Sequence, residues 1–388
     1  MPHRVVEEQR PTGAKPPDGR EQDRATRKSA IGLLITGLAA GAGGLAMLRQ
    51  AGPCTVGMAL GGIGLIGFGV VWGVRGIGRL FKLLRKSSGG AMKTMAAIGV
   101  LVLGGGVIVI HPGRPLYMQH RDVEMVADDG VTLRGTISLP RWRTKPVPGV
   151  VLVHGSGPLT RGHVVGDVRE LVQRGFAVLA YDKRGAGASS GEYLRMSGDS
   201  ANVVLRRLVA DAALAFDRLA TDPDVDATRL GFFGASQAGW IIPVAAELTR
   251  TPPRFHVILS GPAVSTGVEQ YYSDLTGDGM RRPRIADRAE VERLVLGFDG
   301  DPGFDHAPVL LASRVPTLWL LGDRDESVPA FASVRALDSI RAAGNDRHTV
   351  IRYANANHAL RDVGTDAPVP IWDDMLGWLG QIGVAAPK

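Results

Sequence analysis

Cysteine is almost absent from the sequence, and its absence excludes a disulfide-stabilised fold. Cys54 is the one cysteine in 388 residues, and it lies inside an uncharged apolar run. A chain with one cysteine cannot form an internal disulfide bond. Any domain outside that run therefore folds without disulfide bonds.

Charged residues are missing from three long stretches near the N-terminus. The stretches cover residues 29–48, 50–74 and 94–113, with 20, 25 and 20 uncharged positions. Each is long enough to cross a hydrocarbon core of about 30 Å as a helix. We predict three transmembrane spans there, so a lipid bilayer is an expected partner. The preceding residues 1–28 are polar, with almost no apolar side chain to bury, and we predict a disordered arm.

Lysine and arginine flank the predicted spans unevenly. Seven lie in residues 1–28 and six separate the second and third runs, whereas Arg49 alone separates the first and second. Cytoplasmic segments carry the excess of Lys and Arg, so the N-terminus is expected inside the cell. After three crossings the C-terminal domain is expected on the extracytoplasmic side of the cell membrane. The alternative is a retained signal anchor with the later runs at the interface; a cleavable signal peptide is not predicted.

The positive charge of the chain is confined to its N-terminal part. Residues 1–121 hold 16 Lys and Arg against 5 Asp and Glu, and residues 122–388 hold 29 against 33. Basic membrane flanks suit anionic headgroups, and no nucleic-acid partner is predicted. The oligomeric state is not predicted from the sequence.

Metal and phosphate motifs are also missing. The histidines at positions 163, 256 and 306 have no metal-ligand spacing. The glycine-rich segment 181–189 lacks the spacing of a P-loop and the Lys-Ser/Thr that would follow it. Neither a metal nor another cofactor is predicted.

After residues 112–115 the pattern changes to strands alternating with helices, and we predict one catalytic domain over residues 120–388. This alternation predicts an α/β fold with a mostly parallel sheet flanked by helices. The strand pattern stops within about residues 262–312, where we predict a small cap inserted over the site. Predicted strands cover residues 123–126, 131–138, 147–153, 176–180, 316–321 and 348–353, with another beginning at Leu230; predicted helices cover 166–174, 202–219 and 240–248.

The strand at Leu230 runs through small residues into a serine and then a helix. A sharp strand-to-helix turn holds its serine in a strained conformation, so the neighbours must be small. Ser236 is therefore the candidate nucleophile. The alternative is a serine that only caps the helix. The small neighbours are Gly234, Ala235, Ala238 and Gly239, and Ala238 stands where the strict G-x-S-x-G pattern has glycine.

A nucleophilic serine needs a base, and the base needs a carboxylate that orients it. For this type of turn the chain order is serine, acid, histidine. Asp325 follows the predicted strand 316–321, and His358 follows the strand 348–353. We predict Asp325 as the acid and His358 as the base, although Asp323 and Glu326 crowd the same turn.

Three segments together resemble the α/β-hydrolase superfamily, nearest its dienelactone-hydrolase-like and acyl-peptidase-like branches. They are Gly234–Trp240, Gly322–Pro329 and Asn357–His358. The resemblance covers about residues 120–385 and implies an α/β-hydrolase fold. It also implies that the loop after the third strand supplies half of an oxyanion hole, which assigns the backbone N–H donors to Ser156 and Gln237. His154 in that loop is expected to have a structural role.

The predicted function is that of a membrane-anchored serine hydrolase acting on a small acyl substrate. Hydrolysis of a carboxylic ester or thioester through an acyl-enzyme on Ser236 is preferred, because the resemblance includes no peptidase-specific accessory domain. Two alternatives stay open. One is a serine aminopeptidase or acyl-peptidase that acts on short peptides, and the other is a non-catalytic hydrolase-like binding module.

Overall fold

The computed structural model describes residues 117–197 and 200–384. These residues belong to one compact unit, which begins at Gly113. The predicted polar arm and the three predicted spans lie outside them. Within the described ranges, no helix combines the length and the apolar character that a bilayer crossing requires.

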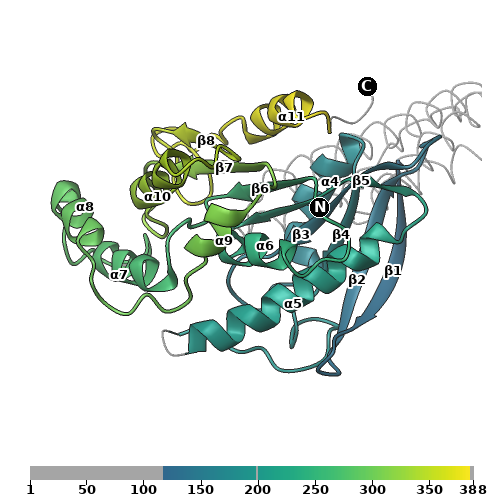
Figure 1. The fold of residues 1–388 in the computed structure, drawn as a ribbon, viewed down its shortest axis with the longest axis horizontal. Helices are drawn as coiled ribbons and strands as arrows, with labels where there is room; N and C mark the ends of the chain where they lie inside the picture. The colour runs from purple at the N-terminus through teal and green to yellow at the C-terminus, as the bar shows by residue number, and fades with distance from the viewer. Residues whose placement is uncertain (1–116, 198–199, 385–388) are drawn as a thin grey trace, which may run out of the picture. The chain divides into compact units, whose positions relative to one another are not determined.

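One eight-stranded sheet forms the centre of the unit (Figure 1), in the order β1-β2-β4-β3-β5-β6-β7-β8. β1 pairs antiparallel with β2, and β2 pairs antiparallel with β4, whereas all further pairs are parallel. The predicted mostly parallel sheet is confirmed. The strands are β1 Met118–Val126, β2 Thr132–Pro140, β3 Val147–Val153, β4 Ala177–Tyr181, β5 Val225–Ala235, β6 Phe255–Leu259, β7 Thr317–Gly322 and β8 His348–Tyr353.

Helices cover both faces of this sheet. Side chains of α5, α6 and α10 share one buried cluster with the sheet, and side chains of α4 and α11 share the other. The helices are α4 Val165–Gln173, preceded by a 3-10 turn η1 Arg161–Val164, α5 Ala201–Ala220, α6 Ala238–Ala246, α7 Thr266–Thr276, α8 Arg288–Leu296, α9 Ala307–Ala312, α10 Ala330–Ala342 and α11 Ile371–Gln381.

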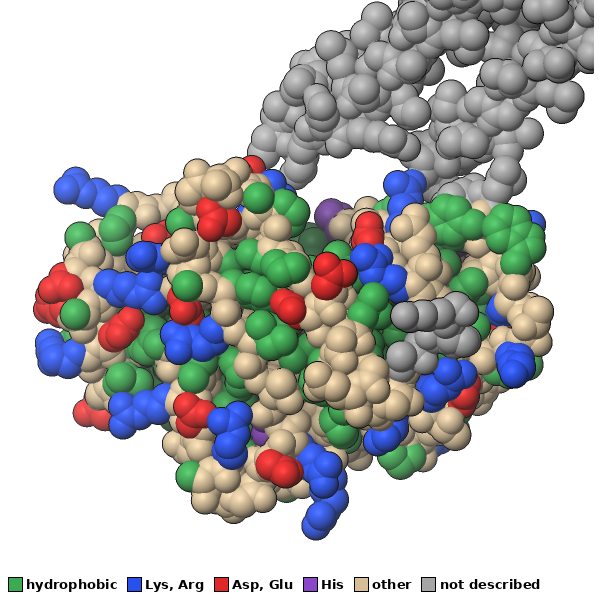
Figure 2. Space-filling view, turned by 90° about the horizontal axis from the view of Figure 1, so that it is seen from above, with side chains coloured by type: hydrophobic (Ala, Val, Ile, Leu, Met, Phe, Trp, Pro, Cys, Tyr) green, Lys and Arg blue, Asp and Glu red, His purple; other side chains and the backbone are tan. Residues whose placement is uncertain are grey.

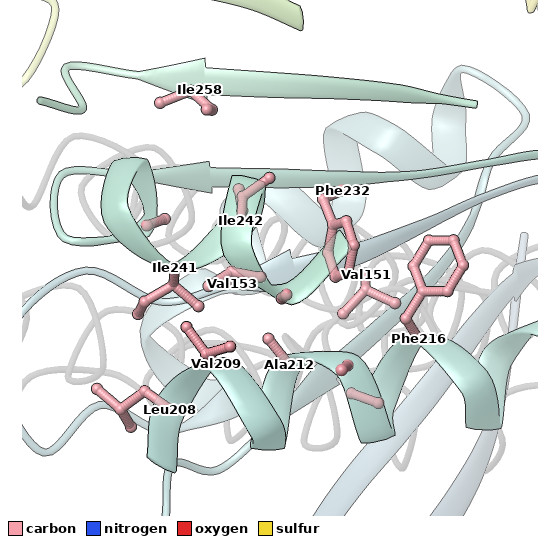
Figure 3. Close-up of a cluster of buried hydrophobic side chains, with 14 of the residues drawn as sticks. Val151, Val153, Leu208, Val209, Ala212, Phe216, Phe232, Ile241, Ile242 and Ile258 are labelled. Atoms are coloured by element: carbon pink, nitrogen blue, oxygen red, sulfur yellow. The ribbon is translucent and has the colours of Figure 1, made fainter. Parts of the chain in front are cut away.

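The central strands are apolar on both faces because helices cover both. All seven residues of β3 are buried, as expected for a parallel strand between two helical layers. Successive side chains of a strand point to opposite faces. Val151 and Val153 therefore enter one cluster, and Val150 and Leu152 enter the other. In Figure 3, Val151 and Val153 lie between Phe216 of α5 and Ile241 of α6.

α7 and α8 form a small separate layer beside the carboxyl ends of β6 and β7 (Figure 1). They have their own apolar cluster, which includes Tyr272, Leu275, Val291 and Val295 and also Ala332 at the start of α10. Leu310 of α9 packs instead in the main core. The segment predicted as a cap therefore divides into two parts. α7 and α8 form the layer near the site, and α9 packs against the main core.

Candidate active site

Ser236 stands in a strained turn between β5 and α6. Its φ is +57°, in the left-handed region that a residue with a Cβ seldom adopts. The Ser236 N–H donates to the Leu259 carbonyl at 2.9 Å, and its own carbonyl accepts from Gly239 N–H at 2.8 Å. These two bonds fix the turn. Strain of this kind costs of order 1–3 kcal/mol and is typical of functional sites.

The residues around Ser236 must be small because larger side chains would collide with neighbouring atoms. A Cβ on Gly234 would lie 2.6 Å from the Val153 carbonyl oxygen and 2.6 Å from the Ala238 Cβ. A Cβ on Gly239 would lie 2.8 Å from the ring of Pro262. The Ala238 methyl group fits because Gly234, which faces it, has no side chain. The departure from the strict glycine pattern is therefore accommodated.

Asp325 and His358 are directly hydrogen-bonded. His358 Nδ1 lies 2.8 Å from Asp325 Oδ2, and Asp325 Oδ1 accepts from the N–H groups of Ser327 and Val328 at 2.8 Å each. The buried carboxylate is thus held by its own loop. An Nδ1 that donates to Asp325 leaves Nε2 free to accept a proton.

The surroundings of His358 favour its protonated form. Burial lowers the pKa of His358, but the hydrogen bond and the charge of Asp325, together with the charges of Asp278 and Glu269, outweigh burial and raise it above its usual value of 6.5. An imidazolium that forms here during a reaction is therefore stabilised.

The other two acids of the Asp325 loop have different contacts. Asp323 receives two hydrogen bonds from Arg352, at 2.9 and 3.0 Å. The backbone carbonyl of Glu326 accepts a hydrogen bond from Thr276 on α7. Of the three acids in this turn, Asp325 is the one that bonds to His358.

Ser236 and His358 line one cavity of about 480 Å³, together with Ser156 and Gln237. A larger cavity of about 900 Å³, next to α7 and α8, shares His358 with it. Sites for small ligands commonly have volumes of roughly 300–1,000 Å³. The structure thus brings Ser236, Asp325 and His358 to one place at the carboxyl ends of β5, β7 and β8.

The two predicted oxyanion donors lie on either side of Ser236. Gly155 passes so close that a Cβ on it would lie 3.4 Å from the Ser236 Cβ. Gln237 begins α6. The backbone N–H groups of Ser156 and Gln237 donate to no other residue in the part of the chain that the structure describes. Both groups are therefore available to an oxygen of a bound substrate.

His154, in the same loop as Ser156, has a structural role. Its Nε2 bonds to the Tyr181 carbonyl, and burial lowers the pKa of His154 to about 4. A neutral, enclosed imidazole anchors the loop to β4.

Three polar side chains of the site were not predicted as site residues. Glu269 and Asp278 line the Ser236 cavity, and Lys183 bonds to Gln237. The first two belong to the predicted cap segment, whose mixed charges gave no signal for one position. Lys183 stands between Asp182 and Arg184, which form ion pairs with Arg161 and Asp211.

Comparison with known proteins places this geometry in context. The model of the prolyl oligopeptidase family matches residues 165–382, a segment that contains Ser236, Asp325 and His358. A polyketide transferase of Penicillium crustosum is 30% identical over 154 residues. The match covers 39% of this chain and 47% of that protein, so the chain spans about half the length of this relative.

Two solved structures resemble the fold. An esterase of Pyrococcus furiosus has a TM-score of 0.50 and 18% identity, covering 68% of this chain and 91% of that one. An acetyl xylan esterase from Paenibacillus sp. R4 has a TM-score of 0.50 and 19% identity, covering 70% and 86%. At these identities the likeness concerns the fold alone, and the fold is that of an α/β hydrolase.

Proposed function

The chain belongs to the prolyl oligopeptidase family, and on that premise we propose that it hydrolyses a carboxylic ester or thioester through an acyl-enzyme on Ser236. The observation that carries the proposal is the 2.8 Å bond between His358 and Asp325, at a cavity that the strained Ser236 also lines.

In the proposed reaction the Ser236 hydroxyl attacks the acyl carbon while His358 Nε2 accepts its proton. Asp325 holds the His358 tautomer and stabilises the imidazolium. The N–H groups of Ser156 and Gln237 donate to the oxyanion. Collapse of the tetrahedral intermediate expels the leaving group, which takes the proton from His358. Water activated by the same histidine then releases the acid product.

We prefer an ester as the substrate because of the domain composition of the described residues and the volume of the cavity. The described residues form one sheet domain with the small α7–α8 layer, and this part of the chain includes no propeller or other accessory domain. A cavity of about 480 Å³ accepts a small acyl group. These features support a compact substrate.

Labelling with a fluorophosphonate probe, followed by an ester panel, tests the proposal. We expect labelling of the wild-type chain and none of the Ser236→Ala or His358→Ala variants. Asp325→Asn should lower kcat by about 10³–10⁴-fold, as the loss of a triad acid does. Asp323→Asn is the matched control, and its kcat should stay within about twofold of the wild-type value, because Asp323 pairs with the half-exposed Arg352 and not with His358. Absence of wild-type labelling, or equal losses in the two Asn variants, would contradict the proposal.

A second candidate, an aminopeptidase that acts on short peptides, is favoured by Glu269. Its carboxyl group lines the Ser236 cavity and has no hydrogen-bond partner among the described residues. Burial raises the pKa of Glu269 to about 8, assisted by the charge of Asp278. A protonated α-amino group would favour ionisation of Glu269 and pair with it.

Paired substrates separate the two candidates. For an aminopeptidase, aminoacyl anilides with a free α-amino group should be cleaved faster than their N-acetylated forms, and Glu269→Gln should remove the difference. For an esterase of simple acyl groups, esters should be cleaved faster than anilides. Glu269→Gln should then change kcat/KM for neutral esters by less than about twofold. Fast cleavage of both anilides, unaffected by Glu269→Gln, would exclude Glu269 as the group that selects the substrate.

We further propose that residues 29–113 anchor the enzyme in the cell membrane with the hydrolase domain outside. The proposal is supported by the three uncharged runs and the uneven Lys and Arg around them.

A further inference from the structure

A buried lysine bonds to both loops that carry the oxyanion donors. Lys183 follows β4 and is 2% exposed. Its Nζ donates to the carbonyl oxygen of Gly155 at 2.9 Å and to the side-chain oxygen Oε1 of Gln237 at 2.9 Å. Lysine is almost never fully buried unless it is paired with an acid. Here both acceptors are neutral.

Burying the charged Lys183 side chain without a salt bridge is energetically unfavourable, which indicates a functional role. Burial lowers the pKa of Lys183 to about 8. No carboxylate among the described residues forms a salt bridge with its ammonium group; the ring of Tyr193 lies 5.8 Å away. The charge of Asp211 also acts on Lys183, but a buried cation with no salt-bridge partner, next to the candidate nucleophile, is the kind of group that a site retains for function and not for stability.

The first acceptor determines where the Ser156 N–H points. The Gly155 carbonyl and the Ser156 N–H belong to one peptide group, which is planar and trans, so that they point in opposite directions. When Lys183 holds the carbonyl oxygen on one side, the N–H is directed to the other. A cation on the carbonyl also polarises the peptide group and makes its N–H a stronger donor.

The second acceptor belongs to the residue that carries the other donor. Gln237 follows Ser236 directly as the N-cap residue of α6, and its side chain is buried. Its amide nitrogen also approaches the sulfur of Met196 at 3.6 Å. With Oε1 held by Lys183, the start of α6 is fixed relative to the Gly155–Ser156 loop. One ammonium group thus ties the two halves of the site together.

We propose that Lys183 is a positioning residue that directs the N–H groups of Ser156 and Gln237 toward the developing oxyanion. This inference rests on the proposed acyl transfer at Ser236. Lys183 does not touch the substrate, and it acts through the Gly155–Ser156 peptide group and the Gln237 side chain.

The test compares Lys183→Met with a variant that loses similar bonds far from the site. Arg121→Met is that control. Arg121 bonds to Asp222 at 2.6 Å and to Asp224 at 2.9 Å. Both acids directly precede the amino end of β5, whereas Ser236 follows its carboxyl end. Kinetics with the best ester of the panel and urea unfolding are measured for both variants in the full chain.

We expect Lys183→Met to lower kcat about 10²-fold with KM within about threefold, since loss of one oxyanion donor costs roughly 10²–10³-fold in kcat. Affinity for a boronic acid that mimics the tetrahedral intermediate should fall in parallel. Affinity for the product carboxylate should not, because it does not require the oxyanion geometry. Arg121→Met should lose stability and keep its kcat.

A second variant keeps the inference testable if Lys183→Met fails to fold. Gln237→Met retains the backbone N–H and the Lys183 bond to Gly155, so it should give a smaller loss of kcat with the same parallel loss of boronate affinity. Labelled wild-type enzyme with unchanged kcat in both variants, or with a loss confined to KM, would overturn the inference. Wild-type protein that fails to label would instead overturn the acyl-transfer function.

Discussion

In the proposed reaction, the charge of His358 decides activity near neutral pH. Only its neutral form accepts the serine proton, and the hydrogen bond and charge of Asp325, with the charge of Asp278, raise the pKa of His358 above 6.5 against the effect of burial. We therefore expect kcat/KM to fall as the pH drops through a value above 6.5.

Asp278 offers a test of this explanation. Asp278→Asn removes a negative charge near His358, destabilises the imidazolium, and so should move the acidic midpoint of kcat/KM to lower pH. Asp299→Asn, in the exposed loop after α8 and absent from the groups that act on His358 or Glu269, is the control. An unchanged or higher midpoint in Asp278→Asn would contradict the assignment.

That Ser236, Asp325 and His358 lie at one site could be predicted from the sequence, whereas the contacts of Lys183 around them could not. Ser236, Asp325 and His358 each stand just after an apolar strand, so local pattern and chain order indicate them. The role of Lys183 depends on Gly155 and Gln237, which lie 28 and 54 positions away in the chain. A local sequence pattern does not indicate contacts between residues that lie so far apart in the chain.

At the scale of elements, one arginine joins three parts of the fold through two ion pairs. Arg184, in the loop after β4, donates to both carboxylate oxygens of Asp211 on α5 at 2.7 and 2.6 Å. It also donates to Asp129 in the β1–β2 turn at 2.7 Å. Asp211 is fully buried. Burial raises the pKa of Asp211, and the Arg184 contact opposes that shift.

Removing Asp211 should therefore destabilise the fold strongly. Asp211→Ala leaves the Arg184 charge buried with only the half-exposed Asp129 as a partner, and we expect the free energy of unfolding in urea to fall by about 3–5 kcal/mol. The control is Glu124→Ala, which breaks an exposed pair with Arg134 and should cost about 0.2–1 kcal/mol. Similar losses in both variants would show that Arg184 finds another partner or water.

The sequence predicted elements with a strong apolar pattern and missed short or mixed ones. β3 is apolar throughout and was predicted from Val147 to Val153, as observed. β6 was not predicted. It has five residues with His256 inside, and so short a run does not distinguish a strand from part of a buried helix. The strand order was also not predicted, because it is fixed by contacts between distant segments.

At the scale of the molecule, the described unit has what an independent domain needs. Two apolar clusters fill the two sides of its sheet. In the face shown in Figure 2, basic and acidic side chains are interspersed. This agrees with 29 Lys and Arg against 33 Asp and Glu in residues 122–388. The basic character of the chain resides before residue 122.

Division of the chain at residue 115 should therefore separate anchoring from catalysis. The full chain is expected to sediment with membranes and to resist carbonate extraction, because the three uncharged runs are proposed as spans. A chain of residues 115–388 should stay in the supernatant and keep kcat/KM within about twofold, since its core is internal to it.

The full chain, the chain of residues 115–388 and a C-terminal reporter each test one part of the membrane proposal. Full-length protein that is released by carbonate would refute the spans. An aggregated or inactive chain of residues 115–388 would mean that residues before 115 belong to the folded hydrolase. A C-terminal reporter active only in the cytoplasm should stay silent in the full chain, because an odd number of spans carries the C-terminus outward from an internal N-terminus. A strong signal would reverse the topology and leave the chemistry of Ser236 unaffected.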